Sequence, residues 1–427
     1  MPVNQRPQVV ILGGGFGGLY AVQSLKYVPV DVILIDRRNF HLFQPLLYQV
    51  ATGWLSPANI ASTLRIVLRA QKNARILLAE ATDIDVNNRH VILNIGKIPY
   101  DTLIVATGSR HHYFGNDQWE SLAPGLKTIE DAIEIRRRIF LSFEAAEREV
   151  SAQRSPGQLT FIIIGGGPTG VELAGAVADI VNDTLTNDFR RINQSDVQIL
   201  LVEAADRILT TYPVELAKKA ESFLNQAGVS VKGSSTVTAI DESGVSIKYG
   251  EVIERIPCRT VLWAAGVCAS FLGTVLTRQT GAKLDRSGRL LVEPDLSLRG
   301  HPEIFVIGDL ANYLHQTGHP LPGIAPVAMQ QGRYVARLLS RRIAGKTTIP
   351  FHYKDRGNMA IVGRGTAVAD LRGIHITGFW AWLAWLFVHL INLVVFENRV
   401  LVLIQWGWYY FRRDRAARLI TGDRYTR

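Results

Sequence analysis

The chain has 427 residues, 47% of them hydrophobic and 37 of them glycine, which favours an α/β protein of two or three domains. Two cysteines are too few for a disulfide-stapled secreted protein, and an apolar strand from about residue 8 leaves no room for a signal peptide, so we expect a reducing compartment. The formal net charge is +10, but no nucleic-acid-binding module is recognisable, so an anionic membrane surface is the better explanation.

Two glycine fingerprints stand 152 residues apart, each directly after an apolar strand. The first strand, 9–12, runs into Gly-Gly-Gly-Phe-Gly-Gly at 13–18, and the second, 161–164, runs into Gly-Gly-Gly-Pro-Thr-Gly at 165–170. Such a turn brings backbone close to a pyrophosphate, which then lies at the N-terminus of the following helix. A pair of such units predicts two dinucleotide sites, whereas an ordinary glycine-rich turn would explain only a single copy.

An acidic residue ends the next strand of each unit. Asp36 lies 23 residues after Gly13, and Glu203 closes the strand at 197–202. A carboxylate there accepts hydrogen bonds from both ribose hydroxyls and repels a 2′-phosphate. We therefore expect the second site to prefer NADH over NADPH.

Three further strands end in small-residue turns. The first unit closes at Ala106-Thr107-Gly108 and the second at Ala264-Ala265-Gly266, so the two units end alike. Between the first and the second nucleotide unit, residues 127–150 form a charged helical linker. A later strand at 304–307 ends in Gly308-Asp309, and it marks the return of the chain to the first domain after an insertion. Asp309 is either a helix N-cap or a ligand of a ribityl hydroxyl.

These motifs in this order resemble the two-dinucleotide flavoproteins. The strings at 41–50, 165–175 and 325–332 narrow the resemblance to the type II NADH:quinone oxidoreductases, which are single-subunit and do not pump protons. The resemblance implies an α/β fold of two Rossmann-like domains, an FAD domain at 1–120 and 275–345 with an inserted NAD(H) domain at 121–274, followed by a C-terminal helical membrane-anchoring region at 346–427.

The motifs and the resemblance together give the candidate site residues. Expected cofactor-binding residues are Gly13, Gly14, Gly15, Phe16, Gly17, Gly18, Asp36, Arg37, Pro45, Leu46, Ala106, Thr107, Gly108, Gly308, Asp309, Ala325, Val327, Gly165, Gly167, Pro168, Thr169, Gly170, Glu203, Ala265 and Gly266. The cofactors are FAD, with NADH as substrate.

Glu172 and Gln330 are the expected catalytic residues. Glu172 follows the second fingerprint by two residues, and the resemblance implies that it positions the nicotinamide and handles a proton; the alternative is an acid that only favours the helix start. The resemblance also implies quinone contacts from Gln330, Gln331 and Pro326, although Pro326 stands where the family often has Gln. Gln330 could instead bond only to nearby backbone.

Electrons must leave the flavin without a redox disulfide. Cys258 and Cys268 lie ten residues apart and form no Cys-x-x-Cys motif, so we expect them to be structural. We expect no metal site, because the histidines are scattered apart from His111 and His112.

An apolar segment follows the nucleotide units. The 18 residues 379–396 carry no formal charge, and the tail at 412–427 has six arginines against two aspartates. Arg412, Arg413, Arg415 and Arg418 are well placed for anionic lipid. Three interpretations stay open: a transmembrane span, a monotopic helical hairpin in one leaflet, and an apolar homodimer interface. The polar interruptions at His389 and Asn392 favour the hairpin.

The sequence therefore predicts a peripheral flavoenzyme on the cytoplasmic, NADH-containing face of a membrane. It would pass hydride from NADH to FAD and then two electrons to a membrane quinone, without proton pumping. The alternatives are a soluble NADH-dependent redoxin reductase and a membrane-bound flavoprotein that senses NADH with slow turnover.

Overall fold

The structure is a computed structural model that describes residues 6–149, 155–184, 188–412 and 417–422. Its elements fall into two compact units. Unit 1 comprises residues 1–42, 61–110 and 267–354, and unit 2 comprises residues 43–60, 111–266 and 355–427. Unit 2 thus includes residues 43–60, from within the predicted first part of the FAD domain, and residues 355–427 of the predicted C-terminal region.

Unit 1 is built on a six-stranded sheet in the order β20-β21-β9-β1-β2-β5. The strands β1 (Gln8–Leu12), β2 (Asp31–Asp36), β9 (Thr102–Val105), β5 (Ala74–Leu78) and β21 (His301–Val306) are parallel, and the short β20 (Ser297–Leu298) pairs antiparallel with β21 at one edge. Residues 9–12 are almost fully buried, as expected of a parallel strand covered on both faces.

Two helices of unit 1 pack closely, and a glycine of the second helix lies at the contact. These are α1 (Phe16–Ser24) and α10 (Ala325–Ile343). A Cβ on Gly332 would collide with the backbone oxygen of Gly17, so only glycine permits this approach. The unit is completed by a meander of β6 (Ala81–Asp85), β7 (His90–Leu93) and β8 (Gly96–Pro99), by α9 (Leu272–Thr280) against β6, and by the pair β3 (Phe40–Leu42) and β4 (Ala61–Thr63).

Unit 2 repeats the plan with a four-stranded parallel sheet in the order β13-β12-β11-β17. Its strands are β11 (Thr160–Ile164), β12 (Gln198–Val202), β13 (Val229–Lys232) and β17 (Thr260–Trp263), and its helices include α6 (Pro168–Asp179) and α8 (Val214–Gln226). An antiparallel meander of β14 (Ser235–Asp241), β15 (Gly244–Tyr249) and β16 (Val252–Pro257) is attached to it.

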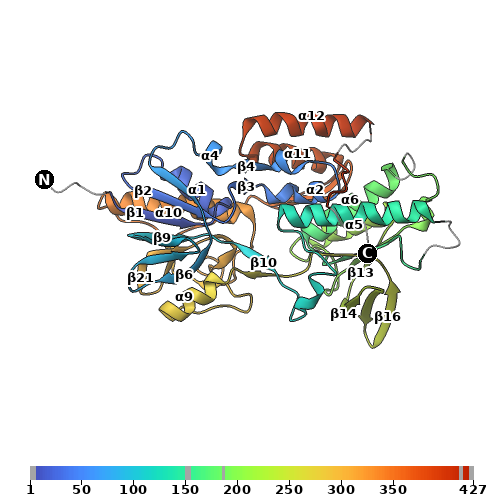
Figure 1. The fold of residues 1–427 in the computed structure, drawn as a ribbon, viewed down its shortest axis with the longest axis horizontal. Coiled ribbons are helices and arrows are strands. Elements are labelled where there is room, and N and C mark those ends of the chain that lie inside the picture. Colours follow the sequence, from blue (N-terminus) through green and yellow to red (C-terminus); the bar gives the residue numbers. More distant parts are fainter. Residues whose placement is uncertain (1–5, 150–154, 185–187, 413–416, 423–427) are drawn as a thin grey trace. The chain divides into compact units, whose positions relative to one another are not determined.

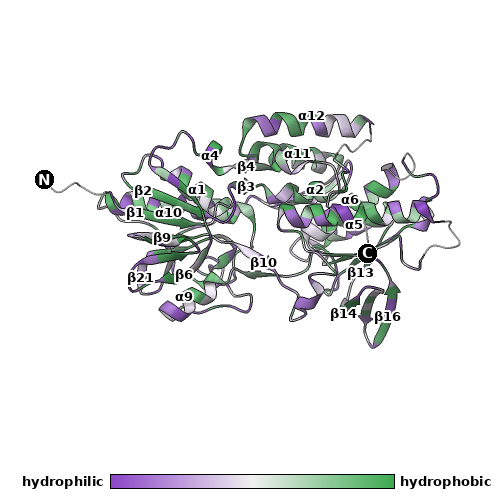
Figure 2. Cartoon of the chain, viewed as in Figure 1, coloured by the Kyte–Doolittle hydropathy of each residue, from purple (hydrophilic) through white to green (hydrophobic). Residues whose placement is uncertain are grey.

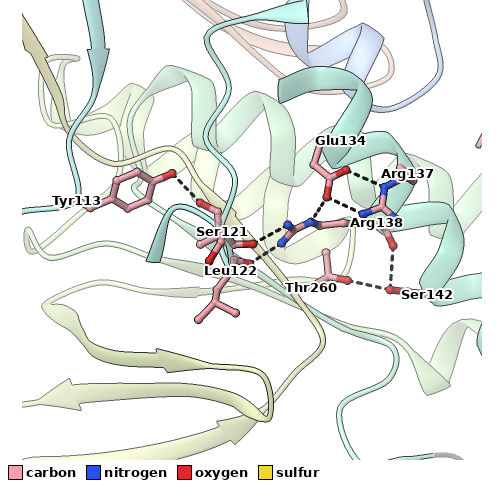
Figure 3. Close-up of polar contacts among 9 residues, drawn as sticks. Tyr113, Ser121, Leu122, Glu134, Arg137, Arg138, Ser142 and Thr260 are labelled. Atoms are coloured by element: carbon pink, nitrogen blue, oxygen red, sulfur yellow. Dashed lines mark hydrogen bonds and ion pairs between the residues drawn. The ribbon is translucent and has the colours of Figure 1, made fainter. Parts of the chain in front are cut away.

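The long helix α5 (Ile129–Arg148) is fixed to this sheet by polar contacts (Figure 3). It begins with a capping box between Thr128 and Asp131. The Arg138 guanidinium binds the Glu134 carboxylate at 2.6 Å and the carbonyl oxygens of Leu122 and Ser121. One turn on, the Ser142 hydroxyl lies 2.8 Å from that of Thr260 in β17. These contacts join the predicted charged linker to the second nucleotide sheet.

The C-terminal part of unit 2 is a three-stranded antiparallel sheet followed by two helices (Figure 1). The strands are β23 (Asn358–Gly363), β24 (Thr366–Leu371) and β25 (Ile374–Gly378), and the helices are α11 (Phe379–Asn392) and α12 (Phe396–Arg412). The apolar segment is thus divided at residues 393–395. Across the described ranges, no helix is both long and apolar enough to cross a membrane.

The predicted α/β class is confirmed: two parallel sheets each carry a glycine turn between the first strand and a helix. The predicted linker helix is α5.

Candidate active site

The first glycine turn joins β1 to α1 and is open on one side. Gly13 has a φ of +100°, and a side chain there would run into the Ala106 backbone. A Cβ on Gly18 would collide with the Gly13 carbonyl group, whereas a Cβ on Gly15, the N-cap of α1, would meet nothing within 4 Å. The three fingerprint positions therefore serve the turn, the helix–strand contact and an open approach for a ligand.

Asp36 closes this turn from the end of β2. Its Oδ2 accepts a hydrogen bond from the Gly14 N–H at 2.6 Å, and its Oδ1 accepts one from the Arg38 N–H at 2.7 Å. Burial raises the pKa of this carboxyl group, opposed by those two N–H groups and by Arg37 and Arg38. Arg37 itself is exposed.

The second turn, between β11 and α6, repeats this geometry. Gly165 has a φ of +106°, a Cβ on Gly170 would collide with the Gly165 carbonyl group, and a Cβ on the N-cap residue Gly167 would meet nothing within 4 Å. Glu203, just after β12, accepts a hydrogen bond from the Gly166 N–H at 2.5 Å and one from the Ala205 N–H at 2.8 Å. Pro168 and Thr169 are exposed at the first turn of α6.

Both turns suit an anion. Neither α1 nor α6 has a side-chain cap or an acidic residue in its first turn, so the amide groups at both N-termini face outward with the positive end of the helix dipole. Both places therefore fit a pyrophosphate, with the Asp36 or the Glu203 carboxylate beside it.

The remaining unit 1 candidates lie at the ends of β9 and β21. After β9, the Thr107 Oγ1 atom is buried with no hydrogen-bond partner among the described residues, and the Ser109 hydroxyl donates to the Asp309 carboxylate at 2.7 Å. Gly308 has a φ of +72° and its N–H donates to Gln331. A buried unsatisfied hydroxyl is costly, so Thr107 fits a position that a bound cofactor would complete.

The start of α10 lies in the same unit, and its two glutamines are held by backbone. Gln330 donates from Nε2 to the Lys354 carbonyl at 2.9 Å and accepts at Oε1 from the Lys354 N–H at 3.0 Å. Gln331 is 1% exposed, and its Oε1 accepts from the Gly308 N–H at 2.7 Å. Ala325, Pro326 and Val327 form the first turn of α10, which has no acidic residue. The quinone contacts expected of Gln330, Gln331 and Pro326 stay predictions.

Glu172 lies in the first half of α6, within unit 2. The Ile361 N–H of β23 and the Trp385 indole of α11 face its carboxyl group, and both favour the ionised form. Burial is the larger effect and raises the pKa of Glu172 to about 8. At neutral pH the group therefore holds a proton.

An aromatic pocket adjoins this part of unit 2. It is lined by residues of the α2 segment, α6, the β23 turn, α11 and α12: Tyr48, Gln49, Trp54, Ala176, Asp179, Ile361, Gly363, Arg364, Trp382, Leu386, Trp406 and Tyr410. Helix α2 (Leu47–Ala51) follows the turn η1 (Gln44–Leu46), and α3 (Pro57–Ile60) follows in turn. Its walls are largely aromatic with a few polar groups, and its cavity volume of about 20 Å³ is room for little more than one water molecule.

Buried polar contacts connect α2 to α12. Gln49 is 4% exposed, accepts from the Trp406 Nε1–H at 2.8 Å and donates to the Tyr48 hydroxyl at 3.0 Å. The string at 41–50 contributes to the family resemblance, but we predicted no role for Tyr48 or Gln49. The signal that could have identified them is their position two and three residues beyond Leu46, an expected cofactor-binding residue.

The other candidates are placed as follows. Pro45 and Leu46 lie in η1, within unit 2. Ala265 and Gly266, with a φ of +68°, follow β17. Cys258 and Cys268 do not form a disulfide with each other, and burial raises the pKa of Cys258 to about 12. Within the part of the chain that the structure describes, no group of His, Cys, Asp and Glu could hold a metal ion.

The known proteins that are similar to this chain indicate one family. Residues 7–332 match the family model of the pyridine nucleotide-disulphide oxidoreductases. The type II NADH:quinone oxidoreductase NdhA of Mycobacterium tuberculosis is 43% identical, over 99% of this chain and 91% of that protein, and the enzyme of Staphylococcus haemolyticus is 30% identical, over 88% and 92%. In fold, NDH2 from Plasmodium falciparum in complex with NADH is similar with a TM-score of 0.87 at 20% identity, over 98% of this chain and all of that one.

Proposed function

The chain belongs to the type II NADH:quinone oxidoreductases of the pyridine nucleotide-disulphide oxidoreductase family, and from this premise we propose roles for its residues. The enzyme transfers electrons from NADH through FAD to a quinone without pumping protons. When bound, FAD supplies the two-electron chemistry that links the two substrates.

In this proposal unit 1 holds FAD. The open side of Gly15 and the N-terminus of α1 receive the pyrophosphate, and Asp36 binds the ribose beside it. Thr107 and Asp309 bind the remainder of the cofactor, while Gln331 fixes the Gly308 turn. The first turn of α10 directs its positive end toward negative charge on the reduced cofactor.

Unit 2 holds NADH at the equivalent turn. Gly167 and the N-terminus of α6 receive the pyrophosphate, and Glu203 binds the ribose hydroxyls and disfavours a 2′-phosphate. On the same helix, Glu172 carries a proton at neutral pH for delivery toward the quinone, whose reduction requires two protons as well as two electrons.

We also propose that α11 and α12 rest on the membrane surface. They expose large apolar side chains with exposed fractions of 41–82%: Phe379, Trp380, Leu383, Phe387, Val388, Ile391, Phe396, Val400, Leu401, Leu403, Ile404, Trp408 and Phe411. Figure 2 shows green residues on both helices, interrupted on α12 by purple and pale segments. A patch of this kind indicates an apolar partner, and a lipid-soluble quinone requires the enzyme to be at the bilayer.

The structure describes two of the four arginines that we expected to meet anionic lipid. Arg412 lies over the ring of Trp408 at the end of α12, in a position suited to lipid headgroups. Arg418 instead forms an ion pair with Asp188 of unit 2. Arg413 and Arg415 lie outside the described residues.

The proposal depends chiefly on one observation, the duplicated glycine turn with an open N-cap glycine and a bonded carboxylate. The test is steady-state NADH oxidation by the flavin-loaded enzyme with a short-chain quinone, compared with ferredoxin. Rapid turnover with quinone and none with ferredoxin is expected. Preference for ferredoxin would favour a redoxin reductase, and slow turnover with both would favour an NADH sensor.

The membrane proposal is tested by co-sedimentation with vesicles of mixed anionic and neutral lipid. Binding that survives high salt is expected, because apolar contact is not screened. An enzyme that stays in the supernatant as a homodimer would show that the helices cover each other in a second copy of the chain.

A further inference from the structure

Trp385 combines complete burial with an indole N–H that lacks an ordinary hydrogen bond. It projects from α11 into unit 2 and is 0% exposed. Its Nε1 atom is buried with no hydrogen-bond partner among the described residues. A buried donor without a partner costs stability, so its persistence requires a reason.

The acceptor that the indole faces is the carboxyl group of Glu172. A protonated carboxyl group is a weak partner for a donor, whereas a carboxylate forms a short, charge-assisted hydrogen bond. The Trp385 N–H therefore has a strong partner only while Glu172 is ionised. We propose that Trp385 is a positioning residue for Glu172, which holds its carboxylate from α11 and thereby sets the ease with which Glu172 releases and regains a proton. This inference rests on the proposed role of Glu172 in proton delivery.

The ring of Trp385 is fixed on several sides, as a positioning role requires. His389 stacks on it with a centroid distance of 3.8 Å and an interplanar angle of 20°, and its Nδ1 lies 2.8 Å from the Trp385 carbonyl oxygen. Tyr48 and Trp406 approach with centroid distances of 6.3 and 6.0 Å. The indole therefore has little freedom to turn its N–H elsewhere.

Among the described residues, the hydrogen-bonding groups that act on Glu172 are the Trp385 indole and the Ile361 N–H of β23. The Tyr212 hydroxyl precedes α8, and burial and the nearby Glu172 and Asp370 carboxyls raise its pKa, so it stays protonated. Burial lowers the pKa of His389 on α11 to about 4, so it stays neutral. Further along α6, the Asp179 carboxylate accepts from the Arg364 N–H. Trp385 is thus the side-chain donor that favours the ionised form of Glu172.

The chain offers a matched control for removing this donor. Trp406 is also buried, also contacts the Trp385 ring, and also donates its indole N–H, but to Gln49 at 2.8 Å. Trp385→Phe and Trp406→Phe each delete one buried indole donor and keep an aromatic ring. Only the first removes the donor that faces Glu172.

The experiment is single-turnover reoxidation of the reduced holoenzyme by a short-chain quinone across pH 5.5–9.5. In the wild type, the rate of reoxidation should change with pH in a limb centred near pH 8, where Glu172 titrates. In Trp385→Phe we expect this limb to move upward by about one pH unit, since a hydrogen bond to a charged group is lost. Trp406→Phe should leave the limb in place, and in a Glu172→Gln background Trp385→Phe should shift nothing. An unmoved limb in Trp385→Phe, or an equal shift in Trp406→Phe, would overturn the inference.

A second measurement uses the wild-type enzyme in case Trp385→Phe fails to fold. With ¹⁵N-labelled tryptophan, the Trp385 indole resonance should move downfield as Glu172 ionises, and it should stay fixed in Glu172→Gln. A resonance that does not titrate in the wild type overturns the inference. If Glu172→Gln itself retains the wild-type limb and rate, the proposed role of Glu172 fails instead, which separates the two.

Discussion

The burial of Glu172 predicts a specific pH dependence of stability. Its folded pKa of about 8 lies above the ordinary 4.5. The folded chain therefore keeps a proton that the unfolded chain releases, and the stabilising contribution is complete below pH 4.5 and is lost as pH rises through 8. Each pH unit in that window costs about 1.4 kcal/mol, so about 3 kcal/mol is lost between pH 5 and 7.

Glu172→Gln removes this titration while nearly conserving shape. The difference in unfolding free energy, variant minus wild type, should grow by about 3 kcal/mol from pH 5 to 7. For a domain of roughly 150–250 residues this corresponds to a Tm difference that widens by roughly 6–12 °C. The matched control is Glu251→Gln, whose side chain is 98% exposed and which should give parallel curves.

The assay is thermal unfolding at matched ionic strength between pH 5 and 8, with flavin content measured at each point. A Glu172→Gln curve that runs parallel to the wild type over this range would refute the burial argument, because a group with an ordinary pKa is ionised in both states there.

Three other outcomes follow from the site geometry. Asp36→Ala should lower the FAD content of purified enzyme, whereas Glu203→Ala should raise the KM for NADH by roughly 10- to 100-fold at unchanged FAD content. Each variant loses a charged hydrogen bond worth about 1.5–3 kcal/mol. The reverse pattern would exchange the two sites. Replacing Cys258 and Cys268 together by serine should leave the rate of quinone reduction unchanged, and loss of turnover with intact flavin would contradict direct transfer. The double variant Phe387→Glu with Ile404→Glu should release the enzyme from vesicles, while NADH reduction of a water-soluble acceptor survives. The reason is that each exposed apolar side chain contributes roughly 1.5–3 kcal/mol in lipid. Full retention on vesicles would exclude this face as the anchor.

The sequence could predict the parts of the site that depend on local backbone. In each turn, a buried strand, a glycine with positive φ and the beginning of a helix all lie within about ten residues of sequence. The turns at Gly13 and Gly165 therefore follow from the local sequence alone. Asp36 and Glu203 were also predictable, because parallel strands that begin together end at one edge of the sheet. The hydrogen bonds of Asp36 to Gly14 and of Glu203 to Gly166 agree with this shared edge.

The surroundings of Glu172 could not be predicted in this way. Its pKa depends on Ile361 and Trp385, which lie about 190 and 210 residues further along the chain. Nothing in the string around Glu172 distinguishes a buried acid from one that only favours a helix start. Likewise, the backbone partner of Gln330 is Lys354, and only the folded chain brings them together.

Helix α11 explains why its composition alone left three interpretations open. A helix that is apolar on every side must meet apolar surroundings on every side. Ala381 and Trp385, one turn apart, are fully buried in unit 2, while Trp380, Phe387 and Ile391 are about half exposed or more. One face of α11 thus belongs to the protein core and the other is exposed. Because the core face carries the indole that faces Glu172, the helix that we propose to meet the membrane also bears on the proton of the quinone reaction.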